Sequence, residues 1–122
     1  MTRKGLLMPD VAACLFCRIV TGEIPADIVR ATDDTVAFRD IEPQAPTHVL
    51  VIPRDHHVDI AALVASDPEL AGRLMADAAA VAEELSLAEF RLVLNTGVTA
   101  GQSVFHVHAH VMAGRPFGWP PG

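Results

Sequence analysis

Three histidines at alternating positions, His106, His108 and His110, are the residues whose types and spacing point most directly to chemistry. They follow the tripeptide Gly101-Gln102-Ser103 and are separated by the apolar residues Val107 and Ala109. In a β-strand, alternate side chains share one face, so the three imidazoles are expected to form a row with a spacing of about 6.7 Å. A phosphate group in front of that row would meet a nucleophile and its flanking donors together.

The histidine row has three interpretations. Separate, partly buried histidines would explain one such residue better than three. A catalytic metal site stays open, since neutral imidazoles at positions i and i+2 can share an ion, although the neighbouring sequence supplies no supporting carboxylate. We favour nucleophilic catalysis at phosphorus. A neutral imidazole is abundant at pH 7 because its reference pKa is about 6.5, and it forms a covalent adduct that water can open. The flanking imidazoles and the Ser103 hydroxyl would then bind the phosphoryl oxygens or protonate the leaving group.

The composition bounds the class of protein. The chain has 122 residues, of which 51% are hydrophobic, and a formal net charge of -6. This combination predicts one globular domain with its own core. The negative charge argues against a nucleic-acid-binding surface, which would carry excess Lys and Arg. No acidic residue follows Glu89, whereas Arg91, Arg115 and the three histidines do. This asymmetry favours a small phosphorylated ligand over a polymer.

Membrane and disulfide classes are not indicated. No apolar run approaches the ~20 residues of a membrane span. The two cysteines, Cys14 and Cys17, are three positions apart and do not suggest a disulfide framework. We therefore expect a cytoplasmic protein. The Cys-x-x-Cys pair is half of a typical zinc site, which two histidines would complete; two reduced, buried cysteines are the alternative.

The hydrophobic pattern predicts an α+β fold with an antiparallel sheet. Residues 1–13 are interpreted as a loose N-terminal arm and residues 14–122 as a single domain. Ser66 and Glu69 are expected to form a capping box that begins a long helix reaching about Leu87. The other predicted elements are a short helix at 14–20, strands at 28–31, 35–38, 48–52 and 91–94, a glycine-containing loop at 95–103, and the histidine strand.

The segment from His106 to Met112 resembles the histidine-triad motif, His-φ-His-φ-His-φ-φ, in which φ is apolar. Residues 41–53, residues 101–105 and the ending Trp119-Pro120-Pro121-Gly122 are similar to the branch called histidine-triad nucleotide-binding proteins. The resemblance runs from about Cys14 to the end of the chain. It implies the histidine-triad (HIT) fold, a five-stranded antiparallel sheet with one long and one short helix. It also implies a homodimer that joins two sheets into one.

The resemblance implies a purine nucleoside phosphoramidase. Such an enzyme hydrolyses adenosine 5′-phosphoramidates, with aminoacyl-adenylates as further candidates, to AMP and an amine through a nucleotidyl-histidine intermediate. Catalysis of this kind needs no cofactor. Two alternatives stay open. One is a nucleotide-binding regulatory protein with incidental hydrolysis. The other is a dinucleotide polyphosphate hydrolase, against which the ending at Trp119 argues.

Motif positions imply roles for individual residues. His108 would be the nucleophile, with His110 and Ser103 on the phosphate and with His106 and His48 ordering the network. Phe16, Phe38 and Ile41 would line the base pocket, Asp40 would hold the ribose hydroxyls, and Asn95 would lie near the phosphate. The implied nucleotide-binding set is completed by Gly101, Gln102, Ser103, Val104, His108 and His110, and by Trp119 near the partner's active site.

Two further expectations come from the resemblance. Relatives that keep both cysteines resemble zinc proteins, which implies a structural zinc ion held by Cys14, Cys17, His56 and His106. Glu42 stands where many relatives carry serine. Its charge beside the predicted ribose-binding carboxylate is expected to alter ribose binding or the leaving-group preference.

Overall fold

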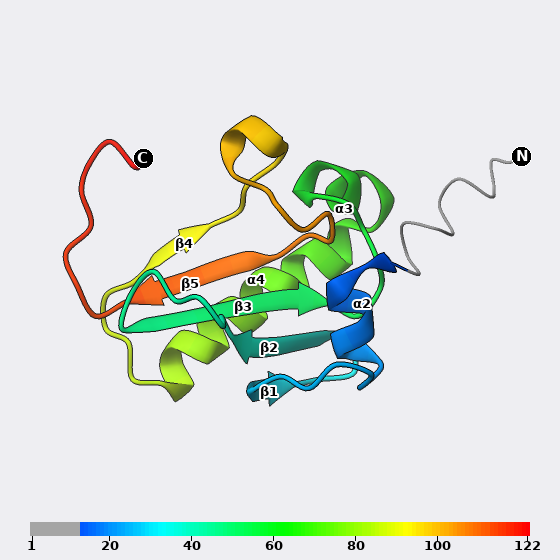
Figure 1. Cartoon of the computed structure of the whole chain (residues 1–122), viewed down its shortest axis with the longest axis horizontal. Coiled ribbons are helices and arrows are strands. Elements are labelled where there is room, and N and C mark those ends of the chain that lie inside the picture. The colour runs from blue at the N-terminus through cyan, green and yellow to red at the C-terminus, as the bar shows by residue number, and fades with distance from the viewer. Residues whose placement is uncertain (1–12) are drawn as a thin grey trace, which may run out of the picture.

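The fold is a five-stranded antiparallel sheet with helices on both faces (Figure 1). The computed structural model describes residues 13–122, so residues 1–12 of the predicted arm lie outside the described residues. The strand order is β1-β2-β3-β5-β4, and every neighbouring pair is antiparallel. The elements are α2 (Leu15–Val20), β1 (Ile28–Ala31), β2 (Thr35–Arg39), β3 (Thr47–Pro53), α3 (Ile60–Ser66), α4 (Pro68–Glu84), β4 (Arg91–Val93), the 3-10 helix η1 (Val98–Ala100) and β5 (Ala109–Ala113). The predicted α+β class and antiparallel sheet are confirmed.

Two apolar clusters hold the layers together. One lies between α4 and the sheet and includes Leu70, Leu74, Val81, Val49, Val51 and Val111. The other lies on the opposite face and includes Phe16 of α2 with Val36, Phe38, Leu50 and Ile52. Successive residues of a strand point to opposite faces, so β3 supplies Val49 and Val51 to one cluster and Leu50 and Ile52 to the other. Among residues 13–122, no helix combines the length and apolar character needed to cross a bilayer.

The helices differ from the prediction in three respects. Helix α3 was not predicted; it begins at its N-cap Asp59, whose side chain accepts a hydrogen bond from the amide of Ala62. Because α3 continues through Ser66, the predicted capping role of Ser66 is wrong. The N-cap of α4 is Asp67, whose carboxylate accepts from the amide of Leu70 at 3.1 Å. Helix α4 also ends at Glu84, three residues earlier than predicted.

The predicted histidine strand begins too early. Strand β5 starts at Ala109, so His106 and His108 precede it and His110 lies within it. The reason is a competing partner: the amide of Val107 donates to the carbonyl oxygen of His57 at 2.7 Å. The segment before β5 is thus bonded to the loop that follows β3. The three imidazoles therefore do not form one row, and the side chain of His106 points in a different direction from the other two.

Candidate functional site

The strand register builds one wall of the site. Phe38 of β2 lies opposite Leu50 of β3, and Leu50 lies opposite His110 of β5. These three side chains share one face of the sheet. His48 stands two positions before Leu50 and therefore points to the same face. The period-two pattern of three strands thus brings two histidines and two apolar side chains together under α2.

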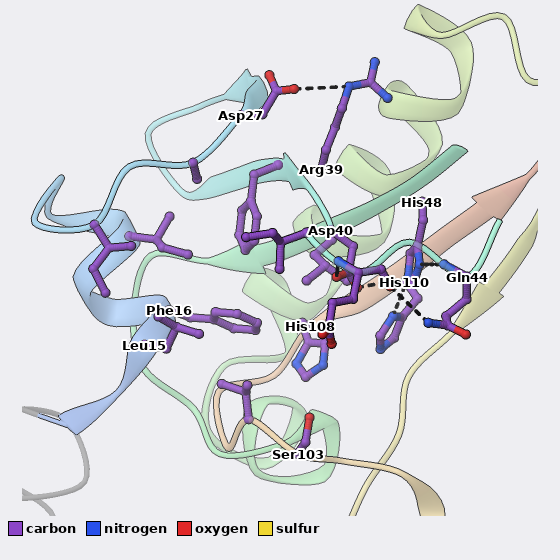
Figure 2. A pocket seen from close by; sticks show the side chains of 18 of the residues that line it. Leu15, Phe16, Asp27, Arg39, Asp40, Gln44, His48, Ser103, His108 and His110 are labelled. Carbon is purple, nitrogen blue, oxygen red and sulfur yellow. Dashed lines mark hydrogen bonds and ion pairs between the residues drawn. The ribbon is translucent and has the colours of Figure 1, made fainter. Parts of the chain in front are cut away.

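A pocket of about 1120 Å³ opens over this face (Figure 2). Its lining comes from α2, the segment that follows it, the β2–β3 region, the loop before β5, and β5. The lining residues are Leu15, Phe16, Ile19, Ile24, Pro25, Ala26, Asp27, Phe38, Arg39, Asp40, Ile41, Glu42, Gln44, His48, Leu50, Gly101, Ser103, Val104, His108 and His110. Figure 2 shows Leu15 and Phe16 at one end of the pocket, Gln44 and His110 at the other, and His108 between them. An apolar end and a polar end suit a ligand with an aromatic base and a charged group.

His108 has its proton placed by the backbone. Its Nδ1 lies 2.8 Å from the carbonyl oxygen of His106. A carbonyl oxygen only accepts, so Nδ1 carries the proton and Nε2 keeps its lone pair. Burial lowers the pKa of His108, while the bond to His106 and the charge of Asp40 oppose that shift. The ring is therefore neutral at pH 7, with a basic nitrogen available to attack an electrophile.

His110 has its proton placed through His48. The amide of Gln44 donates to Nδ1 of His48 at 3.0 Å, so the proton of a neutral His48 sits on Nε2. That Nε2 lies 2.9 Å from Nδ1 of His110 and donates to it. His110 therefore carries its own proton on Nε2. Burial, followed by the neighbouring His108 and His48, lowers the pKa of His110 to about 4, so the ring acts as a neutral N–H donor.

Asp40 is held at the edge of the same group. Its Oδ1 accepts a hydrogen bond from the amide of Glu42 at 2.9 Å, and its Oδ2 lies 3.4 Å from Nε2 of His48. Asp40, His48 and His110 are close enough together to suggest a metal site. The amide of Gln44 argues against it, because this donor needs the lone pair of His48 Nδ1 and leaves a proton on the nitrogen that would bind the ion.

Most of the predicted nucleotide-binding residues line the pocket, and three do not. Gln102 is 3% exposed and turns inward: its amide group donates to the carbonyl oxygen of Val58 and accepts from the amide of Gly97. Asn95 lies behind the lining against Gly101, where an added Cβ would come within 3.4 Å of its Nδ2. Trp119 is 85% exposed and outside the pocket of its own chain, and its predicted place near the partner's active site stays a prediction.

Several lining residues were not predicted. Leu15 and Ile19 are four positions apart on α2 and so share a face with each other. That spacing is visible in the sequence and marks a candidate apolar wall. Leu50 carries an equivalent signal, because it alternates with the predicted His48 along β3. Gln44 acts through its main-chain amide, for which the sequence offers no signal.

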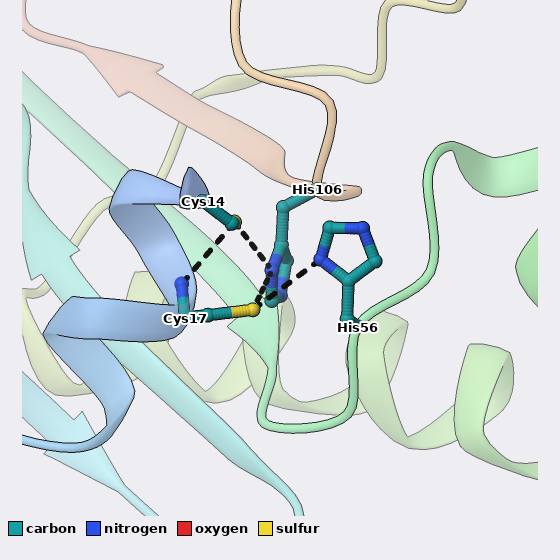
Figure 3. Close-up of side chains that lie close together, drawn as sticks. All are labelled: Cys14, Cys17, His56 and His106. Atoms are coloured by element: carbon teal, nitrogen blue, oxygen red, sulfur yellow. Dashed lines mark hydrogen bonds between the residues drawn. The ribbon is translucent and has the colours of Figure 1, made fainter. Parts of the chain in front are cut away.

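His106 belongs to a second site (Figure 3). It is fully buried and is absent from the pocket lining. Its Nδ1 lies 3.4 Å from Sγ of Cys14 and 3.5 Å from Sγ of Cys17, and Cys17 Sγ lies 3.3 Å from Nδ1 of His56. All four ligand atoms are within 4.8 Å of one another. The residues come from α2 and its N-cap, the loop after β3, and the segment before β5.

The donor set and spacing of this cluster fit zinc. With Zn–S and Zn–N bonds of roughly 2.3 and 2.05 Å, tetrahedral geometry puts sulfur and nitrogen ligands about 3.6 Å apart. The sulfur–nitrogen distances of 3.3 to 3.5 Å are close to that value. Nε2 of His106 donates to the carbonyl oxygen of Pro53 at 2.8 Å, which leaves Nδ1 unprotonated and directed at the cysteines. A hydrogen-bonded second nitrogen of this kind is usual for a metal-bound histidine.

The protonation states at the cluster are also compatible with a cation. Burial lowers the pKa of His106 to about 4, which keeps its ring neutral as a ligand must be. Burial, together with a hydrogen bond and charge from Cys14, raises the pKa of Cys17 to about 12. Two adjacent thiolates are thus unfavourable without positive charge between them, and a divalent ion would supply it.

Comparison with known proteins agrees with this geometry. A family model described as HIT domain matches residues 21–117. An uncharacterised HIT-like protein of Synechocystis is 47% identical over 109 residues, which cover 88% of this chain and 96% of that protein. The purine nucleoside phosphoramidase of Escherichia coli is 43% identical over 106 residues, covering 85% of this chain and 89% of that protein. The crystal structure of a HIT family hydrolase from Legionella pneumophila superposes with a TM-score of 0.85 at 45% identity, covering 89% of this chain and 99% of that one. The chain belongs to the HIT family.

Proposed function

We propose that this protein is a nucleotide hydrolase that cleaves adenosine 5′-phosphoramidates, and aminoacyl-adenylates by the same route, to AMP and a leaving group. The observation that carries the proposal is the proton placement at His108 and His110. The carbonyl oxygen of His106 leaves Nε2 of His108 basic, and His48 leaves Nε2 of His110 as a donor. A nucleophile and a hydrogen-bond donor thus face one pocket. The identity to a purine nucleoside phosphoramidase supports the choice of substrate.

The reaction follows from these protonation states. Nε2 of His108 attacks the α-phosphorus, and the bond from phosphorus to the amine nitrogen breaks. Hydrogen bonds from Nε2 of His110 and from the Ser103 hydroxyl stabilise the phosphoryl oxygens as charge develops on them. Water then attacks the phosphorus of the nucleotidyl-histidine and releases AMP. The departing amine takes up one proton from solvent in the first step, and the attacking water returns one proton to solvent in the second, so protons balance over the cycle.

The pocket walls suit the nucleoside. Phe16 and Phe38 meet edge to face, with ring centroids 5.4 Å apart, and their surroundings are apolar. We assign the purine to this end. The carboxylate of Asp40, fixed by the amide of Glu42, is assigned to the ribose hydroxyls. Both assignments leave the phosphate beside His108.

The test measures AMP and ammonia released from adenosine 5′-phosphoramidate. Replacing His108 by alanine is expected to lower turnover by about a thousandfold or more, because the covalent route is lost. His57→Ala is a matched control, since His57 contributes its carbonyl oxygen to the fold and its side chain is not part of the pocket. Mass spectrometry after brief exposure to substrate should find an acid-sensitive AMP adduct on His108. Full turnover by the His108→Ala variant would remove the mechanism.

We also propose a structural zinc ion at Cys14, Cys17, His56 and His106. The match of the spacing to tetrahedral geometry supports it. Elemental analysis of metal-replete protein should give about one zinc per chain, and a value near zero would refute the assignment. The catalytic steps above do not involve this ion.

A homodimer is proposed at the β4 edge of the sheet. β4 is the last strand in the order, and Phe90 and Leu92 there are 42% and 38% exposed. Arg91 donates to the carbonyl oxygen of Gly118 at 2.8 Å, which keeps the exposed Trp119 near this edge. An uncovered edge strand with exposed apolar side chains is suited to pairing with a second copy.

A cytoplasmic location stays a prediction.

A further inference from the structure

The cysteine–histidine cluster and the pocket share a residue. His106 directs Nδ1 to the two cysteines, and its carbonyl oxygen accepts the proton of His108 Nδ1. One side chain therefore belongs to the cluster while the main chain of the same residue fixes the tautomer of the nucleophile. Any displacement of His106 moves the acceptor on which His108 depends.

Helix α2 makes a second connection. Cys14 caps the helix and Cys17 lies on it, so both sulfur ligands are on the element that carries Phe16. The Phe16 ring stands perpendicular to the His108 ring, with centroids 5.1 Å apart, and also packs against Phe38. Leu15 and Ile19 of the same helix line the pocket. The position of α2 therefore determines where the apolar wall of the pocket lies and where the Phe16 ring contacts the His108 ring.

Helix α2 is too short to hold this position by itself. It has six residues, whereas isolated helices below roughly 12 residues are marginal in water. Its stability depends on its packing through Phe16, Ile19 and Val20 and on its contacts through Cys14 and Cys17. A cation that bonds both sulfurs would tie α2 to the loop at His56 and to His106, which come from distant parts of the chain.

We infer that metal binding at the cluster positions the pocket, so that His106 and α2 hold His108 and the apolar wall in place only when the ion is bound. The inference rests on the proposed function and on the proposed zinc ion, and it adds a role for the ion beyond stability. His106 is in this sense a positioning residue. The ion itself takes no part in bond breaking.

The experiment uses His56, a ligand that lies outside helix α2 and does not line the pocket. His56→Ala should lose zinc, whereas His56→Cys should retain it, because three cysteines and one histidine form a common tetrahedral set. His57→Ala is the matched control at the neighbouring position. Each protein is assayed for zinc content, for AMP binding by titration calorimetry, and for kcat and KM on adenosine 5′-phosphoramidate.

Calorimetry separates positioning from folding. A purely structural role would lower the number of binding-competent molecules and leave the Kd of the folded ones unchanged. Positioning predicts that His56→Ala weakens the Kd for AMP by about tenfold, that the ring ¹⁵N signals of His108 shift, and that His56→Cys restores both. A zinc-free His56→Ala protein with the wild-type Kd and His108 signals would overturn the inference. Absence of zinc from the wild-type protein would overturn it too. If the wild-type protein binds AMP but turns over no phosphoramidate, the proposed function fails while the Kd comparison still decides this inference.

Discussion

Nε2 of His48 donates a hydrogen bond to Nδ1 of His110 over 2.9 Å and so joins β3 to β5 at the polar end of the pocket. His48 is 4% exposed, so neighbouring atoms enclose its ring and restrict its rotation. The contact fixes both the orientation of the His110 ring and its tautomer. His48 is therefore a positioning residue in the proposed mechanism, acting on the substrate through His110.

Replacing His48 by alanine should lower kcat by about ten- to a hundredfold with a smaller change in KM. The reason is that His110 loses the partner that keeps its proton on Nε2, while the base pocket is untouched. Steady-state kinetics on adenosine 5′-phosphoramidate checks this. Thr47→Ala on the same strand serves as control, since adjacent residues face opposite sides. Wild-type kcat in the His48→Ala protein would contradict the assigned role.

The pH dependence of stability tests the burial of His110. Burial lowers its pKa in the folded protein to about 4, against about 6.5 in the unfolded chain. As the pH falls from 6.5 to 4, the unfolded chain takes up a proton on this residue and the folded protein does not, so the free energy of unfolding decreases. The contribution of the neutral His110 ring to the free energy of unfolding is complete above pH 6.5 and is lost as the pH falls towards 4.

The measurement compares urea unfolding of wild-type protein and His110→Gln at pH 7.5 and pH 5. The wild-type protein should lose more stability between these two values than the variant, because the glutamine does not titrate. Using the difference between the two proteins removes the contribution of the groups that do not interact with His110, whereas His48 and His108 are coupled to it. Equal losses would show that His110 titrates in the folded protein as it does in the unfolded chain.

Glu42 is predicted to select the charge of the leaving group. It lines the pocket, and no cation among residues 13–122 forms an ion pair with it. Arg39, the one arginine of the lining, pairs with Asp27 at 3.6 Å. Glu42 also lies in the loop between Asp40 and Gln44, next to the histidine pair. An unpaired carboxylate there favours an amine that carries an ammonium group.

Two phosphoramidates that differ in a distal ammonium or hydroxyl group measure this preference. Replacing Glu42 by glutamine should lower the ratio of their kcat/KM values by about two- to fivefold, the size expected for an exposed charge pair, and the effect should fade in high salt. Glu83→Gln, an exposed acid on α4 far from the lining, controls for net charge. An unchanged ratio would mean that Glu42 plays no part in selectivity.

The dimer proposal predicts that Leu92→Asp dissociates the protein. A charge on the exposed face of the edge strand β4 would be buried without a partner in the interface. Sedimentation equilibrium should show a dimer for the wild-type chain and a monomer for the variant. Ile28→Asp on the opposite edge strand β1, which is 46% exposed, is the matched control and should stay dimeric. A monomeric wild-type protein would refute the proposal.

The sequence predicted the sheet well because period-two patterns report which face a residue takes. His48 and Leu50 alternate with Val49 and Val51, and the structure separates the two pairs onto opposite faces. Helix boundaries were less predictable. Ser66 and Asp67 are both good capping residues, and the choice between them depends on α3, whose seven residues give too short a pattern to be recognised.

Local pattern also could not place the three histidines. Their spacing predicts one face only if the backbone is extended throughout. A hydrogen bond from the amide of Val107 to the carbonyl oxygen of His57, fifty residues away, interrupts the extended backbone before β5. His106 therefore meets the cysteines, and His108 meets the pocket. Gln102 is a similar case, because its inward direction depends on the carbonyl oxygen of Val58. Long-range backbone contacts of this kind leave no local trace in the sequence.

The hydrogen bond from the Gln44 amide to His48 has a consequence for how this loop can vary. Every amino acid but one brings the same N–H to that position, so the proton arrangement of both imidazoles should survive a wide range of replacements. Proline alone lacks the group. When all amino acids are placed at residue 44 and the variants are selected for turnover, polar, apolar and charged residues should be recovered and proline alone should be missing.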